Sequence, residues 1–239
     1  MRSGANPFVE FGQSLAVDVV ERVSHTLEPL IPPSAAGEPA DLAIFTSQVA
    51  VERVTEDPRL AALRSRVERA ARVGAVGPAT AEALRRHGIE AGIAAEGSAE
   101  ALLGRLPDRL NGWRVLFPCG EDAAEELPEG LRRRGARVER LAVYRKVPRA
   151  REPDLEREIR DRPFAAFCAT SPSAAAWLFD GLAEDAAERM RHTPAVALGP
   201  FTRRYLEARG VERIAVTDEP RFASALRLLE ALASSPGGA

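Results

Sequence analysis

The sequence predicts an α/β protein of two similar lobes, each built on a parallel sheet. Short apolar runs alternate with helical patterns along the chain, which is typical of parallel strands joined by helices. A Gly-Pro-x-Thr motif occurs twice, at residues 77–80 and 199–202. Each copy follows an apolar run that ends in Thr-Ser, with Ser47 in the first half and Ser171 in the second. One repeated pattern in each half favours two lobes within 239 residues.

Each copy of the motif predicts the start of a helix. The glycine can act as N-cap, and the proline suits the first helical position because its missing N–H would be unpaired there. Gly88 and Gly210, eight positions after the threonines, fit the C′ position where a helix ends. Thr80 and Thr202 then lie in first turns, whose free N–H groups and positive dipole end attract anions. We expect these two turns to present their hydroxyls across a cleft at the carboxyl ends of the strands.

The elements of the first half are predicted from apolar spacing and turn residues. In chain order we expect a strand or short helix at 15–23, a linker at 30–40, a strand before Thr46, helices at 49–54 and 59–72, strands at 73–76 and 89–95, and a helix at 98–106. Leu60, Leu63 and Val67 share one face of the second helix. Ser98 is a suitable N-cap for the last helix.

The second half follows the same alternation. We expect a strand at 113–117, a helix at 121–134, a strand at 136–146, a linker at 147–149, a short helix at 155–160, the second repeat, a helix at 221–232 and a loose tail at 234–239. Acidic residues near the start of the 121–134 helix and arginines near its end suit the helix dipole. Pro128 lies inside this helix and is expected to split it.

The composition is that of a globular protein, with 45% hydrophobic and 28% charged residues and no apolar run long enough for a membrane span. A net charge of −2 gives no electrostatic footprint for nucleic acid. The N-terminus lacks a signal-peptide pattern, so we expect a cytoplasmic protein. Cys119 and Cys168 are expected to be free thiols in that compartment.

Most standard catalytic signatures are absent from the sequence. There is no Rossmann glycine motif, and Lys146, the only lysine, is not in a Walker sequence. The three histidines lack metal-ligand spacing, and no nucleophile elbow occurs. An enzyme without metal or nucleotide, or a plain binding protein, remains. Taken singly, Ser47, Ser171, Thr80 and Thr202 are better explained as helix caps or first-turn residues, and their recurrence in both halves makes a binding role as good an explanation as the structural one.

An ordered set of motifs resembles the uroporphyrinogen-III synthase family over about residues 41–232. The motifs are Phe-Thr-Ser at 45–47, Val-Gly-Pro-Ala-Thr-Ala at 76–81, Leu-Phe-Pro-Cys-Gly at 116–120, Val-Tyr-Arg at 143–145, Thr-Ser-Pro-Ser at 170–173 and Leu-Gly-Pro-Phe-Thr at 198–202. The resemblance implies two flavodoxin-like lobes joined by a two-strand linker. The chain would begin in one lobe, complete the other, and return, giving a discontinuous lobe of residues 1–30 and 150–239 and a second lobe of residues 31–149.

The resemblance also implies an activity. Such an enzyme cyclises the linear tetrapyrrole hydroxymethylbilane with loss of water and inverts the terminal ring through a spiro intermediate. It uses no cofactor or metal, and we expect a monomer with this small molecule as its partner. The matched motif positions imply substrate-binding roles for Thr46, Ser47, Thr80, Cys119, Gly120, Tyr144, Ser171, Ser173 and Thr202.

Two departures from the family pattern affect the functional prediction. Family members often carry a tyrosine that assists the leaving hydroxyl, and Trp177 occupies that catalytic position here. An indole N–H donates a hydrogen bond but does not exchange a proton as a phenol does. The chain also opens without a clear first strand. These departures favour, as an alternative, a non-catalytic or regulatory tetrapyrrole-binding relative. The repeat alone also fits a two-lobed binding protein for a small acidic ligand.

Overall fold

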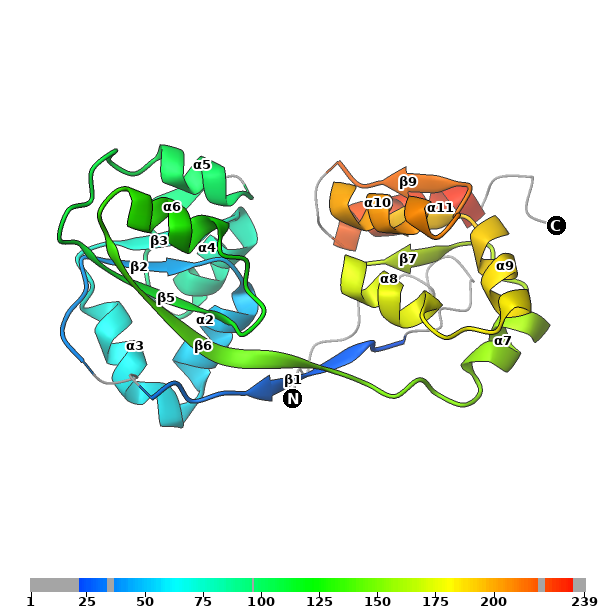
Figure 1. Cartoon of the computed structure of the whole chain (residues 1–239), viewed down its shortest axis with the longest axis horizontal. Helices are drawn as coiled ribbons and strands as arrows, with labels where there is room; N and C mark the ends of the chain where they lie inside the picture. The colour runs from blue at the N-terminus through cyan, green and yellow to red at the C-terminus, as the bar shows by residue number, and fades with distance from the viewer. Residues whose placement is uncertain (1–21, 34–36, 96, 219–221, 234–239) are drawn as a thin grey trace. The chain divides into compact units, whose positions relative to one another are not determined.

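A computed structural model describes residues 22–33, 37–95, 97–218 and 222–233 of the chain. The predicted α/β class is confirmed, because parallel strands alternate with helices (Figure 1). The chain divides into two compact units, each described by itself below. The central unit comprises Leu27–Val147, and the terminal unit comprises Met1–Thr26 with Pro148–Ala239. Most of the element expected at 15–23, and the expected tail at 234–239, lie outside the described residues.

The central unit contains a six-stranded sheet. Its strands are β1 (His25–Pro29), β2 (Leu42–Phe45), β3 (Val73–Val76), β4 (Ile93–Ala95), β5 (Arg114–Gly120) and β6 (Arg137–Pro148), in the spatial order β1-β6-β5-β2-β3-β4. The pairs β2–β3, β2–β5, β3–β4 and β5–β6 are parallel. Leu30 N–H donates to the carbonyl of Val143 and Arg149 N–H to that of Ser24, each at 3.0 Å. Because these partners run in opposite order, β1 is antiparallel to β6.

The order of the parallel strands reverses between β2 and β5. The chain proceeds outward from β2 through β3 and β4, then returns to the other side of β2 to form β5 and β6. Numbered along the chain, the parallel strands read 3-2-1-4-5, whereas flavodoxin reads 2-1-3-4-5. Both orders contain one reversal, and ligands of open parallel sheets bind outside the carboxyl ends of the strands at such a point. The topology therefore predicts a ligand site at the carboxyl ends of β2 and β5.

Alternate side chains of β2 belong to two separate cores. The helices of this unit are α2 (Gln48–Glu56), η1 (Pro58–Leu60), α3 (Ala61–Glu68), α4 (Pro78–Arg86), α5 (Ala99–Gly104) and α6 (Glu126–Arg133). Ala43 and Phe45 share a core with residues of α2, α3 and α4. Leu42 and Ile44 share the other core with residues of α5 and α6. All four side chains are fully buried, so β2 is the central strand and the residues directly after it are firmly positioned.

Two helices differ from the expected boundaries. The helix expected at 121–134 begins later, at Glu126, the first residue of α6, because residues 121–122 form a turn after β5. Pro128 is then the third residue of α6, where its missing N–H has no intrahelical partner to lose, so it does not split the helix. The helix expected at 59–72 divides into η1 and α3, because the Asp57 side chain caps a separate short turn.

The terminal unit contains three described strands, all parallel. They are β7 (Phe167–Ala169), β8 (Ala195–Ala197) and β9 (Ile214–Val216), in that order. The helices are α7 (Leu155–Asp161), α8 (Pro172–Phe179), α9 (Glu184–His192), α10 (Pro200–Ala208) and α11 (Phe222–Ala233). Helix α9 was not expected, since only Ala186, Ala187 and Met190 give it a buried face in a largely charged sequence.

The repeated motif has the same local structure in both units. Its glycine is the N-cap residue and its proline the first residue of α4 and of α10. At the other end, Ile89 N–H donates to the Leu84 carbonyl at 3.0 Å, and Val211 N–H donates to the Leu206 carbonyl at 3.1 Å. The glycine before each donor has a positive φ, +76° and +83° respectively. Both helices therefore end in a Schellman motif, as their glycines predicted.

Candidate active site

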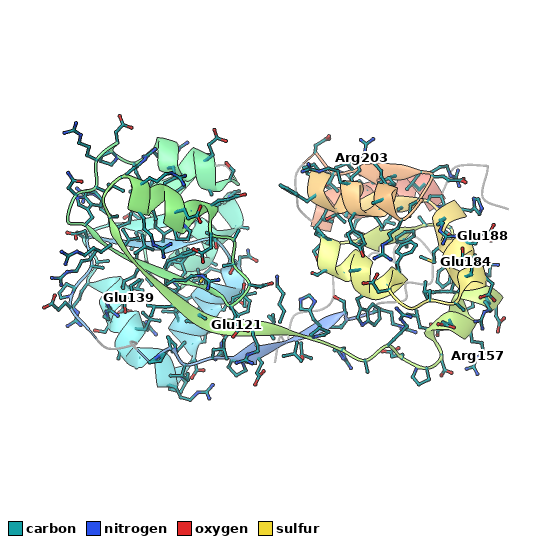
Figure 2. All side chains as sticks on the ribbon, viewed as in Figure 1. Glu121, Glu139, Arg157, Glu184, Glu188 and Arg203 are labelled. Carbon is teal, nitrogen blue, oxygen red and sulfur yellow. The ribbon has the colours of Figure 1, made fainter. Side chains whose placement is uncertain are left out.

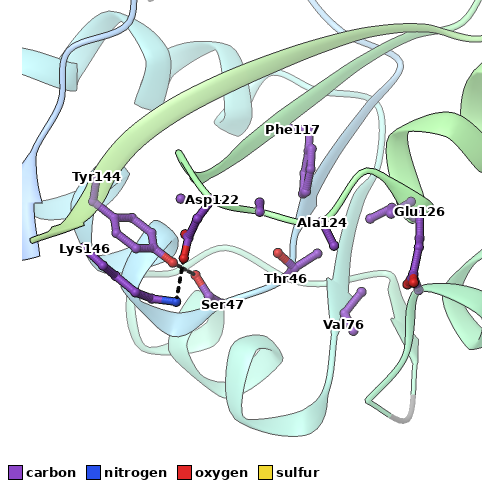
Figure 3. Close-up of a pocket in the computed structure, with 13 residues that line it drawn as sticks. Thr46, Ser47, Val76, Phe117, Asp122, Ala124, Glu126, Tyr144 and Lys146 are labelled. Atoms are coloured by element: carbon purple, nitrogen blue, oxygen red, sulfur yellow. Dashed lines mark hydrogen bonds and ion pairs between the residues drawn. The ribbon is translucent and has the colours of Figure 1, made fainter. Parts of the chain in front are cut away.

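A cavity of about 300 Å³ lies in the central unit at the carboxyl ends of β2 and β5, where the strand order reverses (Figure 3). Four residues expected to bind substrate line it: Thr46, Ser47, Gly120 and Tyr144. Three ionisable residues that were not expected there line it as well: Asp122, Glu126 and Lys146. The cavity thus brings together residues that are separated by up to about 100 positions in the sequence.

Ser47 connects the end of β2 to α2. Its backbone is extended, with φ −148° and ψ 145°, and its Oγ accepts a hydrogen bond from the N–H of Ala50 at 3.1 Å. Ser47 is therefore the N-cap of α2. The same oxygen lies 3.3 Å from the Oη of Tyr144. Because the helix fixes the serine, the serine can orient the phenol.

Tyr144 reaches the cavity because β6 contains a bulge opposite the end of β5. Cys119 pairs with Ala142, but the next residue, Gly120, pairs with Tyr144. The extra residue in β6 redirects the side chains that follow it. The Tyr144 ring is largely buried, at 7% exposure, and its hydroxyl converges with the tips of Ser47 and Lys146 in Figure 3.

The loop after β5 is held by Arg140. The Nη2 of Arg140 donates to the carbonyls of Glu121 and Ala123 at 2.7 and 3.0 Å. The N–H of Glu121 donates to the carbonyl of Tyr144 at 2.9 Å. These bonds fix the path of the loop and direct the side chain of Asp122 to the cavity, where its Oδ2 lies 3.0 Å from the Nζ of Lys146.

Cys119 does not line the cavity. Its side chain is fully buried in the core that faces α5 and α6, and burial raises the pKa of the thiol to about 11. Burial also raises the pKa of Cys168 to about 12. Both cysteines are free thiols, as expected. Burial in an apolar core disfavours the thiolate form, and Cys119 packs in that core beside the bulge.

Thr80 and Thr202 are third residues of α4 and α10, and each is only 4% exposed. The expectation of hydroxyls standing open is corrected, because Thr80 shares the core-facing side of α4 with Ala83 and Leu84. Within the described part of the chain, no hydrogen-bond partner is found for the Oγ1 of Thr80 or of Thr202. Neither oxygen belongs to the completely enclosed polar atoms without a partner. Thr80 is also absent from the cavity lining.

The remaining predicted residues lie in the terminal unit. The Oγ of Ser171 caps α8 by accepting from the N–H of Ala174 at 3.1 Å, and it lies 3.0 Å from the Oγ of Ser173. The indole N–H of Trp177 donates to the carbonyl of Arg149 at 2.8 Å. The donor that Trp177 would offer to a ligand is therefore already engaged.

The missed residues of the cavity had weak sequence signals. Asp122 lies two positions after Gly120, and Lys146 lies two positions after Tyr144, so each follows a recognised motif. Lys146 is also the only lysine among 33 lysine and arginine residues. Neither feature predicts that the two side chains meet, because that contact depends on the pairing of β5 with β6.

Among the described residues, no group of three or more histidine, cysteine or acidic side chains is arranged to hold a metal ion. None of the described helices combines the length and apolar character that a membrane crossing requires. Figure 2 shows the many arginine and acidic side chains that cover both units, among them Arg157, Glu139 and Glu184.

Comparisons with known proteins identify the family and the fold. Residues 15–227 match the family model described as uroporphyrinogen-III synthase HemD. A protein assigned as a uroporphyrinogen-III synthase in Methanothermobacter thermautotrophicus is 32% identical over 216 residues, which cover 87% of this chain and 84% of that protein. Among solved structures, a mutant uroporphyrinogen III synthase of the extremely thermophilic bacterium Thermus thermophilus superposes with a TM-score of 0.65 at 22% identity, covering 94% of this chain and 93% of that one. The uroporphyrinogen-III synthetase of Helicobacter pylori gives a TM-score of 0.62 at 19% identity, covering 87% and 91%.

Proposed function

This chain belongs to the uroporphyrinogen-III synthase family of lyases, which cyclise hydroxymethylbilane, and we propose that the cavity of its central unit holds the reacting end of that substrate. One observation carries the proposal. Thr46 and Ser47 follow β2, Gly120 ends β5, and Tyr144 lies beside it in β6, and all four line one cavity at the reversal of strand order. Ligands of open parallel sheets bind at this point.

The chemistry requires a hydrogen-bond donor for the departing hydroxyl and shelter for the cation that remains. The substrate loses its terminal hydroxyl as water, and ring closure through a spiro intermediate then inverts the last ring. The phenol of Tyr144, oriented by Ser47 at 3.3 Å, is suited to donate to the hydroxyl. A 1,000-fold preference for the inverted product requires only about 4 kcal/mol of differential stabilisation, which a few such hydrogen bonds can supply.

Tyr144 is better suited to this role than Trp177, the residue that the resemblance to the family placed at the catalytic position. The Trp177 N–H is bonded to the carbonyl of Arg149 at 2.8 Å. Tyr205, the second of the two tyrosines, has its Oη 2.6 Å from the Nη2 of Arg209 and 3.4 Å from the Oδ1 of Asp180. These contacts favour Tyr144 as the phenol available to substrate.

We further propose that hydroxyl groups at helix starts bind the carboxylates of the substrate. Ser171 and Ser173 in the terminal unit lie at the start of α8, where N–H groups and the helix dipole attract anions. Thr80 and Thr202 lie in comparable first turns, but each is only 4% exposed and Thr80 does not line the cavity, so their binding role stays a prediction from the repeated motif. Cys119 is not included, since its thiol is enclosed in the core.

The enzyme is proposed to act as a cytoplasmic monomer without a cofactor. The free thiols of Cys119 and Cys168 are consistent with a reducing compartment. Light scattering of the purified protein measures the mass directly, and a dimer across the working concentration range contradicts the monomer.

Isomer analysis tests the function. Purified protein and freshly prepared hydroxymethylbilane should give the type III product, and only type I product would reject the synthase activity. Saturable binding of the substrate without isomer selectivity would instead support a non-catalytic relative, which the occupied indole of Trp177 motivates. Tyr144→Phe should lower kcat at least tenfold, the usual contribution of a proton donor being about 100-fold or more. Trp177→Phe should change kcat much less.

A further inference from the structure

The only lysine of the chain lines the cavity and is paired with an aspartate that also lines it. The Nζ of Lys146, from β6, is 3.0 Å from the Oδ2 of Asp122, from the loop after β5. Figure 3 shows the two side chains reaching toward each other beside Tyr144 and Ser47. Within the described residues, no other partner is found for either side chain.

This ion pair is not a strong structural contact. The side chains of Lys146 and Asp122 are 39% and 55% exposed, and ion pairs of this kind contribute little to folding stability. Lysine also presents a flexible point charge without the fixed geometry of an arginine fork. The pair can therefore be exchanged for another partner at little cost.

The charges of the cavity make such an exchange necessary. Asp122 and Glu126 are the acidic lining residues, and Lys146 is the basic one. While Asp122 is paired with Lys146, the charge of Glu126 leaves the lining with one negative charge in excess. An incoming carboxylate therefore gains a cationic partner in this lining only when Asp122 releases the ammonium group.

The position of Asp122 fits a displaceable group. A Cβ placed on Gly120 would lie 2.9 Å from the Oδ1 of Asp122, so the carboxylate lies back over the bare glycine. The backbone of Asp122 is held by the Arg140 bonds to the neighbouring carbonyls, whereas its side chain is 55% exposed.

We propose that Lys146 binds a carboxylate of the substrate and that Asp122 is a built-in competitor that holds Lys146 in the empty cavity. The ligand class is an oligopyrrole carboxylate, and the inference rests on the proposed function of the cavity. Asp122 and Lys146 thereby set the affinity for substrate without taking part in bond making.

The proposal predicts opposite effects from the two halves of one ion pair. Asp122→Asn should lower the KM for hydroxymethylbilane about two- to fivefold. It removes the carboxylate that competes for Lys146, and the free energy of an exposed ion pair corresponds to a change of that size. Lys146→Met should raise KM about tenfold or more, since it removes a charged hydrogen bond. In the double variant, Asp122→Asn should not lower KM relative to Lys146→Met alone. Thermal unfolding should show all three variants folded.

A matched control separates this effect from general electrostatics. Asp154→Asn removes a negative charge from another exposed ion pair, in which the Oδ1 of Asp154 lies 2.9 Å from the Nη2 of Arg157 in the terminal unit, and should leave KM unchanged. Dissociation constants for uroporphyrin III, a stable octacarboxylate, should follow the same pattern in a fluorescence titration without turnover.

The outcomes are distinguishable. Suppose that the wild-type protein forms the type III product. The inference then fails, while the synthase function stands, if Asp122→Asn raises KM or leaves it unchanged. It also fails if Asp122→Asn lowers KM equally with and without Lys146. If the wild-type protein forms only type I product, the function fails, and the uroporphyrin titration still decides the competition between Asp122 and the ligand.

Discussion

A Cβ added to Gly120 would stand 2.9 Å from the Cζ of Tyr144, so the phenol ring occupies the space that a side chain at residue 120 would need. The pair is opposed across the bulge between β5 and β6. Gly120 is therefore required by close packing, because its φ is not positive. The absence of a side chain at Gly120 therefore allows the Tyr144 ring to take its position in the candidate site.

We expect Gly120→Ala to displace the Tyr144 ring and separate it from Ser47. Overpacking of this kind costs about 1–3 kcal/mol of unfolding free energy. kcat/KM for hydroxymethylbilane should fall along with the melting temperature. Gly104→Ala is the control, since a Cβ there meets nothing within 4 Å. If Gly120→Ala keeps full activity and stability, Tyr144 has room to move and its position is not specified by the glycine.

Ser47 is expected to serve both folding and activity, whereas Ser98 serves folding alone. Both side chains accept a hydrogen bond from a helix N–H, of Ala50 at 3.1 Å and of Ala101 at 3.0 Å. Ser47→Ala and Ser98→Ala should therefore each lower stability by about 1 kcal/mol in chemical denaturation. Only Ser47→Ala should also lower kcat/KM, because only Ser47 contacts Tyr144. Equal kcat/KM in both variants would reduce Ser47 to a helix cap.

The sequence was most informative where local chemistry decides structure. The Thr-Ser turn, the Gly-Pro helix start and the closing glycine each act over a few residues. The turn was found before α2 and α8, and the Gly-Pro start and closing glycine bound α4 and α10, as predicted. The burial of Thr80 was not predictable from its position in a first turn, because it depends on which side of α4 faces the core. The meeting of Asp122 and Lys146 depends on the bulge near Gly120, which leaves no local pattern in the sequence.

Thr80→Val and Thr202→Val test whether these two hydroxyls reach the substrate. Neither Oγ1 is a completely enclosed atom without a partner, so its removal should change the free energy of unfolding by no more than about 1 kcal/mol. If the hydroxyls bind substrate carboxylates as the repeated motif predicts, kcat/KM should fall about tenfold. The control is Thr55→Val, because the buried Thr55 hydroxyl donates to the Val51 carbonyl at 2.8 Å and its loss should lower stability without affecting turnover. Unchanged kinetics in both variants would remove the threonines from the site.

Asp57 should give the protein an acid-sensitive part of its stability. The Arg59 side chain, which hydrogen-bonds the carboxylate, holds the pKa of Asp57 well below its ordinary value of 3.8, and Arg53 acts in the same direction. A lowered folded-state pKa means that the stabilisation is complete above the unfolded value and is lost as the pH falls below about 4 toward the folded value. The charge is almost enclosed, since the side chain is 5% exposed.

Asp57→Asn tests this pH dependence while keeping a side-chain oxygen that can cap η1. Urea denaturation at about pH 7 should show the variant less stable than the wild type, because the charged bonds to Arg53 and Arg59 are lost. The difference should narrow steadily below about pH 4, where the wild-type carboxylate begins to be protonated in the unfolded chain. Asp154→Asn, at an exposed ion pair with Arg157, should show no comparable convergence. A stability difference for Asp57→Asn that stays constant down to about pH 2 would assign its effect to packing, because a charge effect must disappear as the unfolded-state carboxylate takes up its proton.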